Sequence, residues 1–260
     1  MFLDIHTHLD LYEGKMMDLA LGEIERNRIF SVSNSMDFIS YRKNCDLAKK
    51  CKYTLPIFGI HPWNAHLYAD KLDSLEEYIE ESLMIGEIGL DYHFVKDTHQ
   101  QIAQRRVFEF FLNEAKRLNK IVILHTKGAE DDVLRMLRHY NIERAIIHWY
   151  SGPIEKFFDY LREGYVFTIG FMVLYSDFIR VMARKLPVNQ LLTETDNPGG
   201  LQWYSDRAGM PILVKDIVGE IARIRNENKE EIENNIWDNF MQILTYDERN
   251  VIMSCMKNPR

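Results

Sequence analysis

The chain has 260 residues, of which 46% are hydrophobic and 27% charged, and its formal net charge at pH 7 is −7. This length is near that of one eight-fold α/β barrel, and the apolar content is enough for its core. The negative charge weighs against a broad basic surface for nucleic acid, but bound cations can reverse the local sign at a carboxylate-rich site. No apolar run approaches the ~20 residues that a membrane helix needs.

The chain shows no pattern of a secretory signal, because its first residues lead directly into a strand-like run. The cysteines, Cys45, Cys51 and Cys255, are scattered and do not have zinc-finger spacing. We therefore expect a cytoplasmic protein with reduced thiols, no membrane association and no obligate protein partner.

Short strand-like runs alternate with helix-like segments along the chain. The expected strands are residues 2–6, 29–33, 55–60, 84–88, 121–124, 145–147, 165–169 and 191–193. The expected helices include 18–28, 41–52, 72–82 and 100–118, and after the last strand an irregular loop with glycines precedes helices at 211–225 and 229–244.

This alternation predicts an α/β fold, a closed (β/α)8 TIM barrel. An open doubly wound sheet alternates in the same way, but no glycine-rich dinucleotide fingerprint follows the first strand. Without an internal repeat or linker, we expect one metallohydrolase domain over residues 1–260.

Residues that bind metals stand at the carboxyl ends of the expected strands. His6 and His8 are two positions apart and share one strand face, a pattern that alone is more often a polar turn than a metal site. Later strands end in further histidines and carboxylates: His61, Glu87, Asp91, His125, His148, Glu194 and Asp196. Because barrel active sites assemble at this rim, the set predicts a metal centre.

The number of candidate ligands exceeds what one tetrahedral ion needs. Two divalent ions with a carboxylate between them suit the set better, and Glu87 has two oxygens for that role. Such a pair activates a water and stabilises the attacking and leaving oxygens of a displacement at phosphorus. Mixed nitrogen and oxygen ligands admit magnesium, manganese or zinc.

Several motifs together resemble the TatD-like metal-dependent deoxyribonucleases of the amidohydrolase superfamily. They are DIHTHLD at 4–10, GIHP at 59–62, GEIGLDY at 86–92, HWYSG at 148–152 and ETDNP at 194–198. The resemblance runs from the first strand into the helix after Pro211 and implies a metal-bearing TIM barrel that hydrolyses phosphodiester bonds of DNA.

By this resemblance, His6, His8 and Asp196 hold one ion, His125 and His148 hold the other, and Glu87 lies between them. The resemblance also makes Asp196 the base that orients or deprotonates the attacking water. His61 either contacts a substrate phosphate or only stiffens the turn before Pro62.

The chain departs from the family pattern at the expected substrate contacts. Lys127 stands where the family usually has an arginine, which keeps the charge but loses the bidentate fork onto phosphate. Trp149 and Tyr150 replace a pair that is usually Cys-Phe or similar. They, with Trp63, Trp203 and Tyr204, either stack on bases of single-stranded DNA or strand ends, or pack as caps of the barrel.

We therefore predict a metal-dependent ester hydrolase, a deoxyribonuclease that trims strands from an end. One rival is the same barrel acting on a lactone, an amide or an aminoacyl ester, since metal activation of water serves carbonyl substrates equally well. The fourth strand offers Glu87 and no lysine that could be carboxylated, which argues against the cyclic-amidase branch. A non-catalytic metal-binding protein is a second rival, which a missing ligand would favour, and no ligand is missing.

Overall fold

The computed structural model describes residues 1–257. Its strands are β1 (Phe2–Thr7), β2 (Ile29–Asn34), β3 (Thr54–Ile57), β4 (Ile85–Gly89), β5 (Val122–His125), β6 (Ala145–Ile147), β7 (Val166–Ile169) and β8 (Leu191–Thr193). Its α-helices are α1 (Gly14–Asn27), α2 (Phe38–Ala48), α3 (Glu76–Glu81), α4 (Thr98–Leu118), α5 (Glu130–His139), α6 (Ile154–Arg162), α7 (Asp177–Lys185), α8 (Gly199–Ser205), α9 (Val214–Arg225), α10 (Lys229–Ile243) and α11 (Tyr246–Lys257). The 3-10 turns are η1 (Leu9–Leu11), η2 (Pro62–Leu67), η3 (Leu72–Leu75), η4 (Phe171–Leu174), η5 (Val188–Gln190) and η6 (Pro211–Leu213).

Every expected strand is confirmed to within a few residues, and the region after β8 differs most from expectation. The glycine-bearing segment expected as irregular forms the short helix α8, and α11 follows α10 as a further helix that the sequence did not predict. Gly199 and Gly200 weaken helix propensity in α8. Only Ile252 and Cys255 are buried in α11, so its apolar face is too narrow to give a clear helical period.

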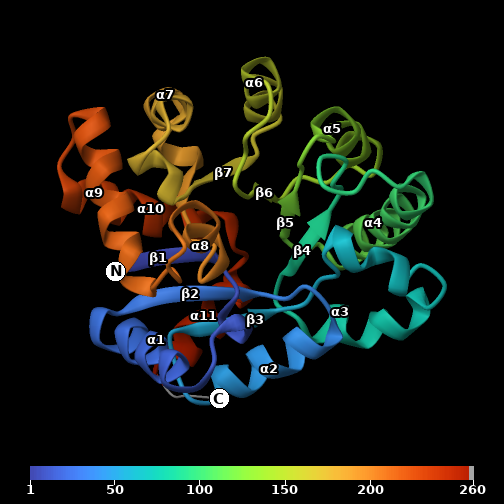
Figure 1. Ribbon diagram of the computed structural model, residues 1–260, viewed down its shortest axis with the longest axis horizontal. Helices are drawn as coiled ribbons and strands as arrows, with labels where there is room; N and C mark the ends of the chain where they lie inside the picture. The colour runs from blue at the N-terminus through green and yellow to red at the C-terminus, as the bar shows by residue number, and fades with distance from the viewer. Residues whose placement is uncertain (258–260) are drawn as a thin grey trace. The chain divides into compact units, whose positions relative to one another are not determined.

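One compact unit contains Met1–Ser33, Arg42–Pro56 and the chain from Phe167 onward. β1 pairs in parallel with β2, as Figure 1 shows, and β7 pairs in parallel with β8. β1 also joins β8, where Thr193 Oγ1 donates a 2.6 Å hydrogen bond to the Leu3 carbonyl. α9 and α10 pack across β1 and β8 and help to close the core of this unit.

The second unit contains Asn34–Tyr41 and Ile57–Val166. β4, β5 and β6 pair in parallel in that order, and α4 packs against β4 (Figure 1). α4 begins where the Asp97 carboxylate accepts a hydrogen bond from the Gln100 N–H (3.0 Å). It ends at Asn119, whose positive φ of 50° terminates the helix.

Apolar residues at helical spacing explain why α4 lies on this sheet. Val107, Phe108, Phe111 and Leu112 are all buried. The Phe111 ring lies 6.1 Å from the ring of Phe58, which precedes the turn leading to η2. This packing fixes the position of β4 and of the residues at its carboxyl end.

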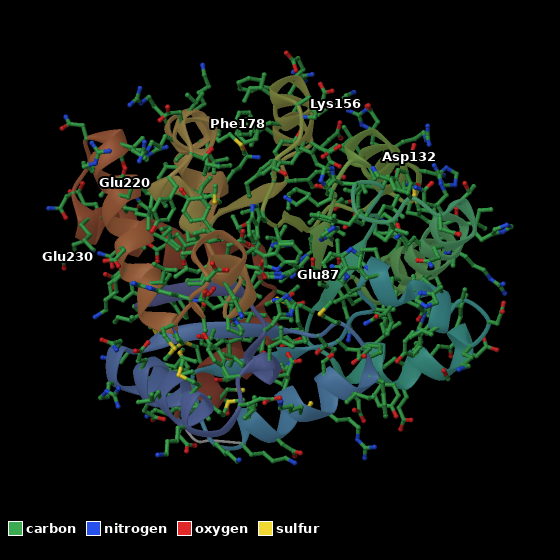
Figure 2. All side chains as sticks on the ribbon, viewed as in Figure 1. Glu87, Asp132, Lys156, Phe178, Glu220 and Glu230 are labelled. Atoms are coloured by element: carbon green, nitrogen blue, oxygen red, sulfur yellow. The ribbon has the colours of Figure 1, made fainter. Side chains whose placement is uncertain are left out.

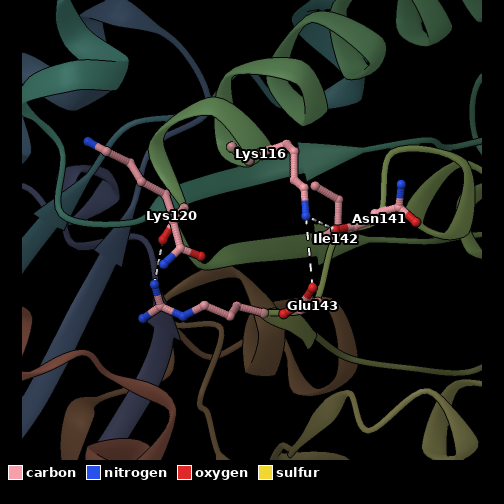
Figure 3. Close-up of a pocket in the computed structure, with 8 residues that line it drawn as sticks. Lys116, Lys120, Asn141, Ile142 and Glu143 are labelled. Carbon is pink, nitrogen blue, oxygen red and sulfur yellow. Dashed lines mark hydrogen bonds and ion pairs between the residues drawn. The ribbon is translucent and has the colours of Figure 1, made fainter.

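A small cavity of about 20 Å³ lies at the amino-terminal side of β5 and β6, between the end of α4 and the segment 141–144 (Figure 3). Lys116 Nζ donates to the Asn141 carbonyl (2.9 Å) and lies 3.8 Å from a Glu143 carboxylate oxygen. The cavity has room for about one water molecule. These contacts tie α4 to the strand that follows α5.

Parallel pairing places the carboxyl ends of neighbouring strands at one edge of each sheet. In the first unit this edge carries His6, His8 and Asp196, and in the second it carries Glu87, His125 and His148. Among residues 1–257, no helix is long and apolar enough to cross a membrane. The single-domain organisation over 1–260 stays a prediction, and residues 258–260 lie outside the described part of the chain.

Candidate metal centre

In the first unit, two imidazoles and one carboxylate converge at the ends of β1 and β8. His6 Nε2 and His8 Nε2 are 3.2 Å apart. They lie 3.5 and 3.3 Å from the same Asp196 oxygen, Oδ1. Both histidines are buried, whereas the Asp196 side chain keeps 17% exposure. We call His6, His8 and Asp196 the first ligand group.

Backbone hydrogen bonds hold the first ligand group together. The Asp196 N–H donates to the His6 carbonyl (2.8 Å), and the His8 N–H donates to the Asn197 carbonyl (2.8 Å). Asp196 has a positive φ of 51°, a conformation that turns the chain directly after β8. The geometry of this group is therefore set by the pairing of two backbone segments.

Asp4 supports the segment from within the core. Its Oδ1 accepts from the Thr195 N–H (2.8 Å) and its Oδ2 from Thr195 Oγ1 (2.6 Å). Burial raises the pKa of Asp4 to about 8, despite the opposing effect of the hydrogen bonds from Thr195. Asp4 thereby couples β1 to the residue that immediately precedes Asp196.

In the second unit, imidazole nitrogens surround one carboxylate oxygen at the end of β4. Glu87, labelled in Figure 2, has its Oε1 2.9 Å from His125 Nδ1 and 3.0 Å from His148 Nε2. His61 Nε2 is 3.5 Å from the same oxygen. All four side chains are buried. We call Glu87, His125 and His148 the second ligand group, with His61 beside it.

Asp91 holds the far side of the His125 ring. Its Oδ2 lies 2.9 Å from His125 Nε2 and accepts a 2.7 Å hydrogen bond from Trp63 Nε1. Its Oδ1 accepts from the backbone N–H groups of His93 and Phe94 (2.9 and 2.7 Å). Asp91 thus fixes the orientation of His125 and leaves Nδ1 directed at Glu87.

The charges of this pair follow from the same contacts. Burial alone raises the pKa of Asp91, but hydrogen bonds from His125, the backbone and Trp63 outweigh burial and hold the pKa well below its ordinary value. Burial alone lowers the pKa of His125, whereas its hydrogen bonds to Asp91 and Glu87 raise the pKa above its ordinary value. Asp91 is therefore ionised, and its carboxylate stabilises a proton on His125 Nε2.

The expected substrate contacts occupy different surroundings. His61 Nδ1 accepts from the Trp63 N–H (3.2 Å), so His61 stiffens its turn and also directs Nε2 at Glu87. Lys127 Nζ donates to Ser151 Oγ (2.7 Å) and lies 5.2 Å from the centre of the half-buried Trp149 ring.

Tyr150 is buried. Its hydroxyl donates to the Pro153 carbonyl (2.7 Å), and its ring packs near Phe157 and Tyr160. This environment favours the packing alternative for Tyr150 over a substrate contact.

Divalent cations fit both ligand groups. Each group brings imidazole nitrogens and a carboxylate oxygen together, the donor set that zinc, manganese and related ions accept. The ligand atoms of His61, Glu87 and His125 all lie within 4.8 Å of one another. Two buried imidazole nitrogens 3.2 Å apart in the first group are similarly placed for one shared ion.

Two functional residues have support roles that the sequence analysis did not assign. In the sequence, Asp91 is one of several acids near strand ends. Its contact with His125 could not be foreseen, because that contact depends on the conformation of the loop after β4. Asp4 shares a strand face with His6, but the depth of its burial is not visible in a two-residue alternation.

Comparison with known proteins places the chain in a family. The model of the TatD related DNase family matches residues 3–245. The chain belongs to the TatD-related DNase family. It is therefore a member of a family of metal-dependent hydrolases, as the motifs predicted, and its α/β fold is that of a solved TatD homolog.

Individual relatives agree with this assignment. The uncharacterized metal-dependent hydrolase MJ1582 of Methanocaldococcus jannaschii is 27% identical over 92% of this TatD-family chain and 94% of its own length. Human deoxyribonuclease TATDN3 is 26% identical over 75% of this chain and 77% of its own. The crystal structure of YjjV, a TatD homolog from Escherichia coli K12, superposes with a TM-score of 0.85 at 23% identity, covering 94% of this chain and 97% of YjjV.

Proposed function

We propose that this TatD-family protein hydrolyses phosphodiester bonds of DNA and removes nucleotides from strand ends. The observation that carries the proposal is the pair of imidazole–carboxylate groups, each placed at the carboxyl ends of parallel strands. Family membership supports hydrolysis, and the human relative is named a deoxyribonuclease.

Both ligand groups bind metal in this proposal. His6, His8 and Asp196 would hold one divalent ion, His125 and His148 would hold a second, and Glu87 would supply carboxylate oxygens to the ions. When bound, such ions lower the pKa of a water molecule and stabilise negative charge on the phosphate oxygens. We infer magnesium, manganese or zinc, which suit these nitrogen and oxygen donors.

The side chains of the protein then divide the remaining work. Asp196 accepts the proton of the attacking water, because its partly exposed carboxylate can reach solvent while its backbone is fixed to β1. Asp91 holds His125 in one orientation, so that Nδ1 faces Glu87 without a rotamer search.

We also propose contacts to the substrate from the second unit. The Lys127 ammonium, placed by Ser151 and by the face of Trp149, attracts a phosphate as a point charge. His61 Nε2 lies beside Glu87 and is positioned to donate to a phosphate oxygen. The half-buried Trp149 ring offers a face to a sugar or base.

A metal-reconstitution assay tests the function. The metal-stripped protein receives magnesium, manganese or zinc and is incubated with single-stranded DNA labelled at one end. We expect a ladder of products that shortens from one end and depends on metal. Asp196→Asn, which keeps the shape but removes the charge, should reduce the rate by about 10²- to 10⁴-fold.

Asp206→Asn is the matched control, because Asp206 is exposed at the end of α8 and accepts the same change at a left-handed backbone position. It should cleave DNA like the wild type. A metal-loaded protein that leaves DNA intact but hydrolyses a lactone or an aryl ester would contradict the nuclease proposal and favour the carbonyl rival.

A further inference from the structure

Exposed aromatic rings gather beside the first ligand group. The rings of Tyr175 and Tyr204 are 4.5 Å apart and inclined by only 32°. Tyr175 is 47% exposed, Tyr204 is 52% exposed, and the adjacent Trp203 is 74% exposed. We call Tyr175 and Tyr204 the aromatic platform.

The platform rests on a rigid base. Phe171 is buried, and its ring centre lies 6.3 Å from those of both Tyr175 and Tyr204. Phe171 begins η4, whose carbonyls at Val173 and Leu174 accept hydrogen bonds from the Arg180 guanidinium (3.1 and 2.6 Å). The two tyrosines come from separate segments. Tyr175 directly follows η4 and Tyr204 belongs to α8, and packing on Phe171 fixes the position of both rings.

The base of the platform touches the segment that carries Asp196. The Gly200 N–H donates to the Asp196 carbonyl (2.6 Å), which ties the first turn of α8 to that residue. A Cβ at Gly200 would lie 3.2 Å from the Phe171 ring and 3.2 Å from Asp196 Cβ. A side chain at position 200 would therefore have to displace the aromatic base or the segment of the proposed catalytic carboxylate by a few tenths of an ångström.

We propose that the aromatic platform binds an unpaired nucleobase next to the phosphodiester that is cleaved. This inference rests on the proposed function and specifies its substrate as single-stranded DNA or a frayed end. Exposed tyrosine rings that pack against each other provide a π-face on which any base can stack, whereas bases inside a duplex have both faces covered. The exposed Arg207, just beyond α8, adds a positive charge that suits a nucleic-acid backbone.

A stacking measurement on the full-length, metal-loaded protein tests this inference. The probe is a single-stranded oligodeoxynucleotide with 2-aminopurine near one end and phosphorothioate linkages that slow cleavage. We expect binding to quench the 2-aminopurine fluorescence. Tyr175→Ala/Tyr204→Ala should weaken binding by about ten-fold or more and abolish the quenching, as removal of base-stacking side chains does.

Two matched variants separate stacking from other effects. Tyr175→Phe/Tyr204→Phe keeps both ring faces and should bind and quench like the wild type. Tyr246→Ala removes an exposed tyrosine at the start of α11 and should also leave binding unchanged. The same oligonucleotide in a duplex should bind more weakly and should not respond to the alanine pair.

The results distinguish this inference from the proposed function. If the alanine pair binds and quenches like the wild type, or changes only the oligomeric state, the platform is not a base-binding site. If the wild type gives no quenching, the inference is overturned even when DNA is cleaved. If quenching depends on the platform but no metal supports cleavage of unmodified DNA, the inference stands and the nuclease proposal fails.

Discussion

The two ligand groups are built from similar side chains but are positioned in different ways. In the first group, the two backbone segments that carry the ligands are hydrogen-bonded to each other, from the Asp196 N–H to the His6 carbonyl and from the His8 N–H to the Asn197 carbonyl. In the second group, a side chain outside the proposed ligand set, Asp91, holds the His125 ring and is itself fixed by Trp63 and by backbone N–H groups.

This difference has a consequence for mutagenesis. Backbone positioning survives the replacement of a neighbouring side chain, because the strand pairing is kept. Positioning by Asp91 can be removed by one substitution that touches no proposed ligand. Substitution of Asp91 should therefore lower the metal affinity of the second group, whereas the metal affinity of the first group should fall only when one of its ligands is replaced.

Removing a ligand from either group should have the largest effect. His8→Ala and His125→Ala should each reduce the metal content from about two ions to about one per chain. Each should also lower nuclease activity by more than about 100-fold, because loss of a ligand should cost more than loss of a residue that only supports a ligand. Elemental analysis of the purified variants, beside rate measurements, checks both values. Retention of both ions in His8→Ala would show that His8 is not a ligand.

Removing the Asp91 support should have an intermediate effect. Asp91→Asn keeps the size of the side chain but loses the charge that orients His125, and we expect metal affinity to fall by about 10- to 100-fold. Metal titration should restore much of the activity, because the ligands themselves remain. Asp70→Asn, an exposed acid whose carboxylate pairs with Arg106, is the matched control and should titrate like the wild type.

A loss of activity in Asp91→Asn that excess metal does not relieve would contradict the positioning role. Trp63→Phe keeps an aromatic ring but removes the Nε1–H donor to Asp91, together with part of the ring's packing, and should shift the titration in the same direction by a smaller factor. Agreement between the two variants would locate the effect in the chain of contacts from Trp63 through Asp91 to His125.

The sequence predicted the parts of the molecule that follow from local rules. Alternation of strand-like and helix-like segments placed β6 and β8 at their observed bounds, because buried parallel strands are short apolar runs. The ligand residues followed from the same rule, since His125 ends β5 and Glu87 lies two residues before the carboxyl end of β4. The family motifs then identified the metal-dependent hydrolase family.

Features that depend on packing could not be decided from the sequence. For Tyr150 the sequence left stacking and packing open, and the fold places its ring in the cluster with Phe157 and Tyr160. Tyr175 and Tyr204 are 29 positions apart by their numbers, and only the folding of η4 against α8 stacks them. The support of His125 by Asp91 likewise arises from a loop conformation.

The smallest expected effect concerns Asp4, the buried acid that supports the first ligand group. In the metal-free folded protein, burial raises the pKa of Asp4 to about 8, whereas an unfolded aspartate ionises near 3.9. Between these values the unfolded chain binds fewer protons than the folded one, so the free energy of unfolding falls as pH rises. The slope is at most about 1.4 kcal/mol per pH unit and ends above pH 8.

Asp4→Asn removes this titration while keeping an acceptor for the Thr195 N–H and a donor for its hydroxyl. Urea unfolding of both proteins in a chelator at pH 5.5, 6.5 and 7.5 measures the difference, in which the titrations of the histidines largely cancel. The stability of the variant relative to the wild type should increase with pH. A difference in stability that stays constant with pH would mean that Asp4 is already ionised in the folded protein. The first ligand group would then be supported by a buried charge that its surroundings balance.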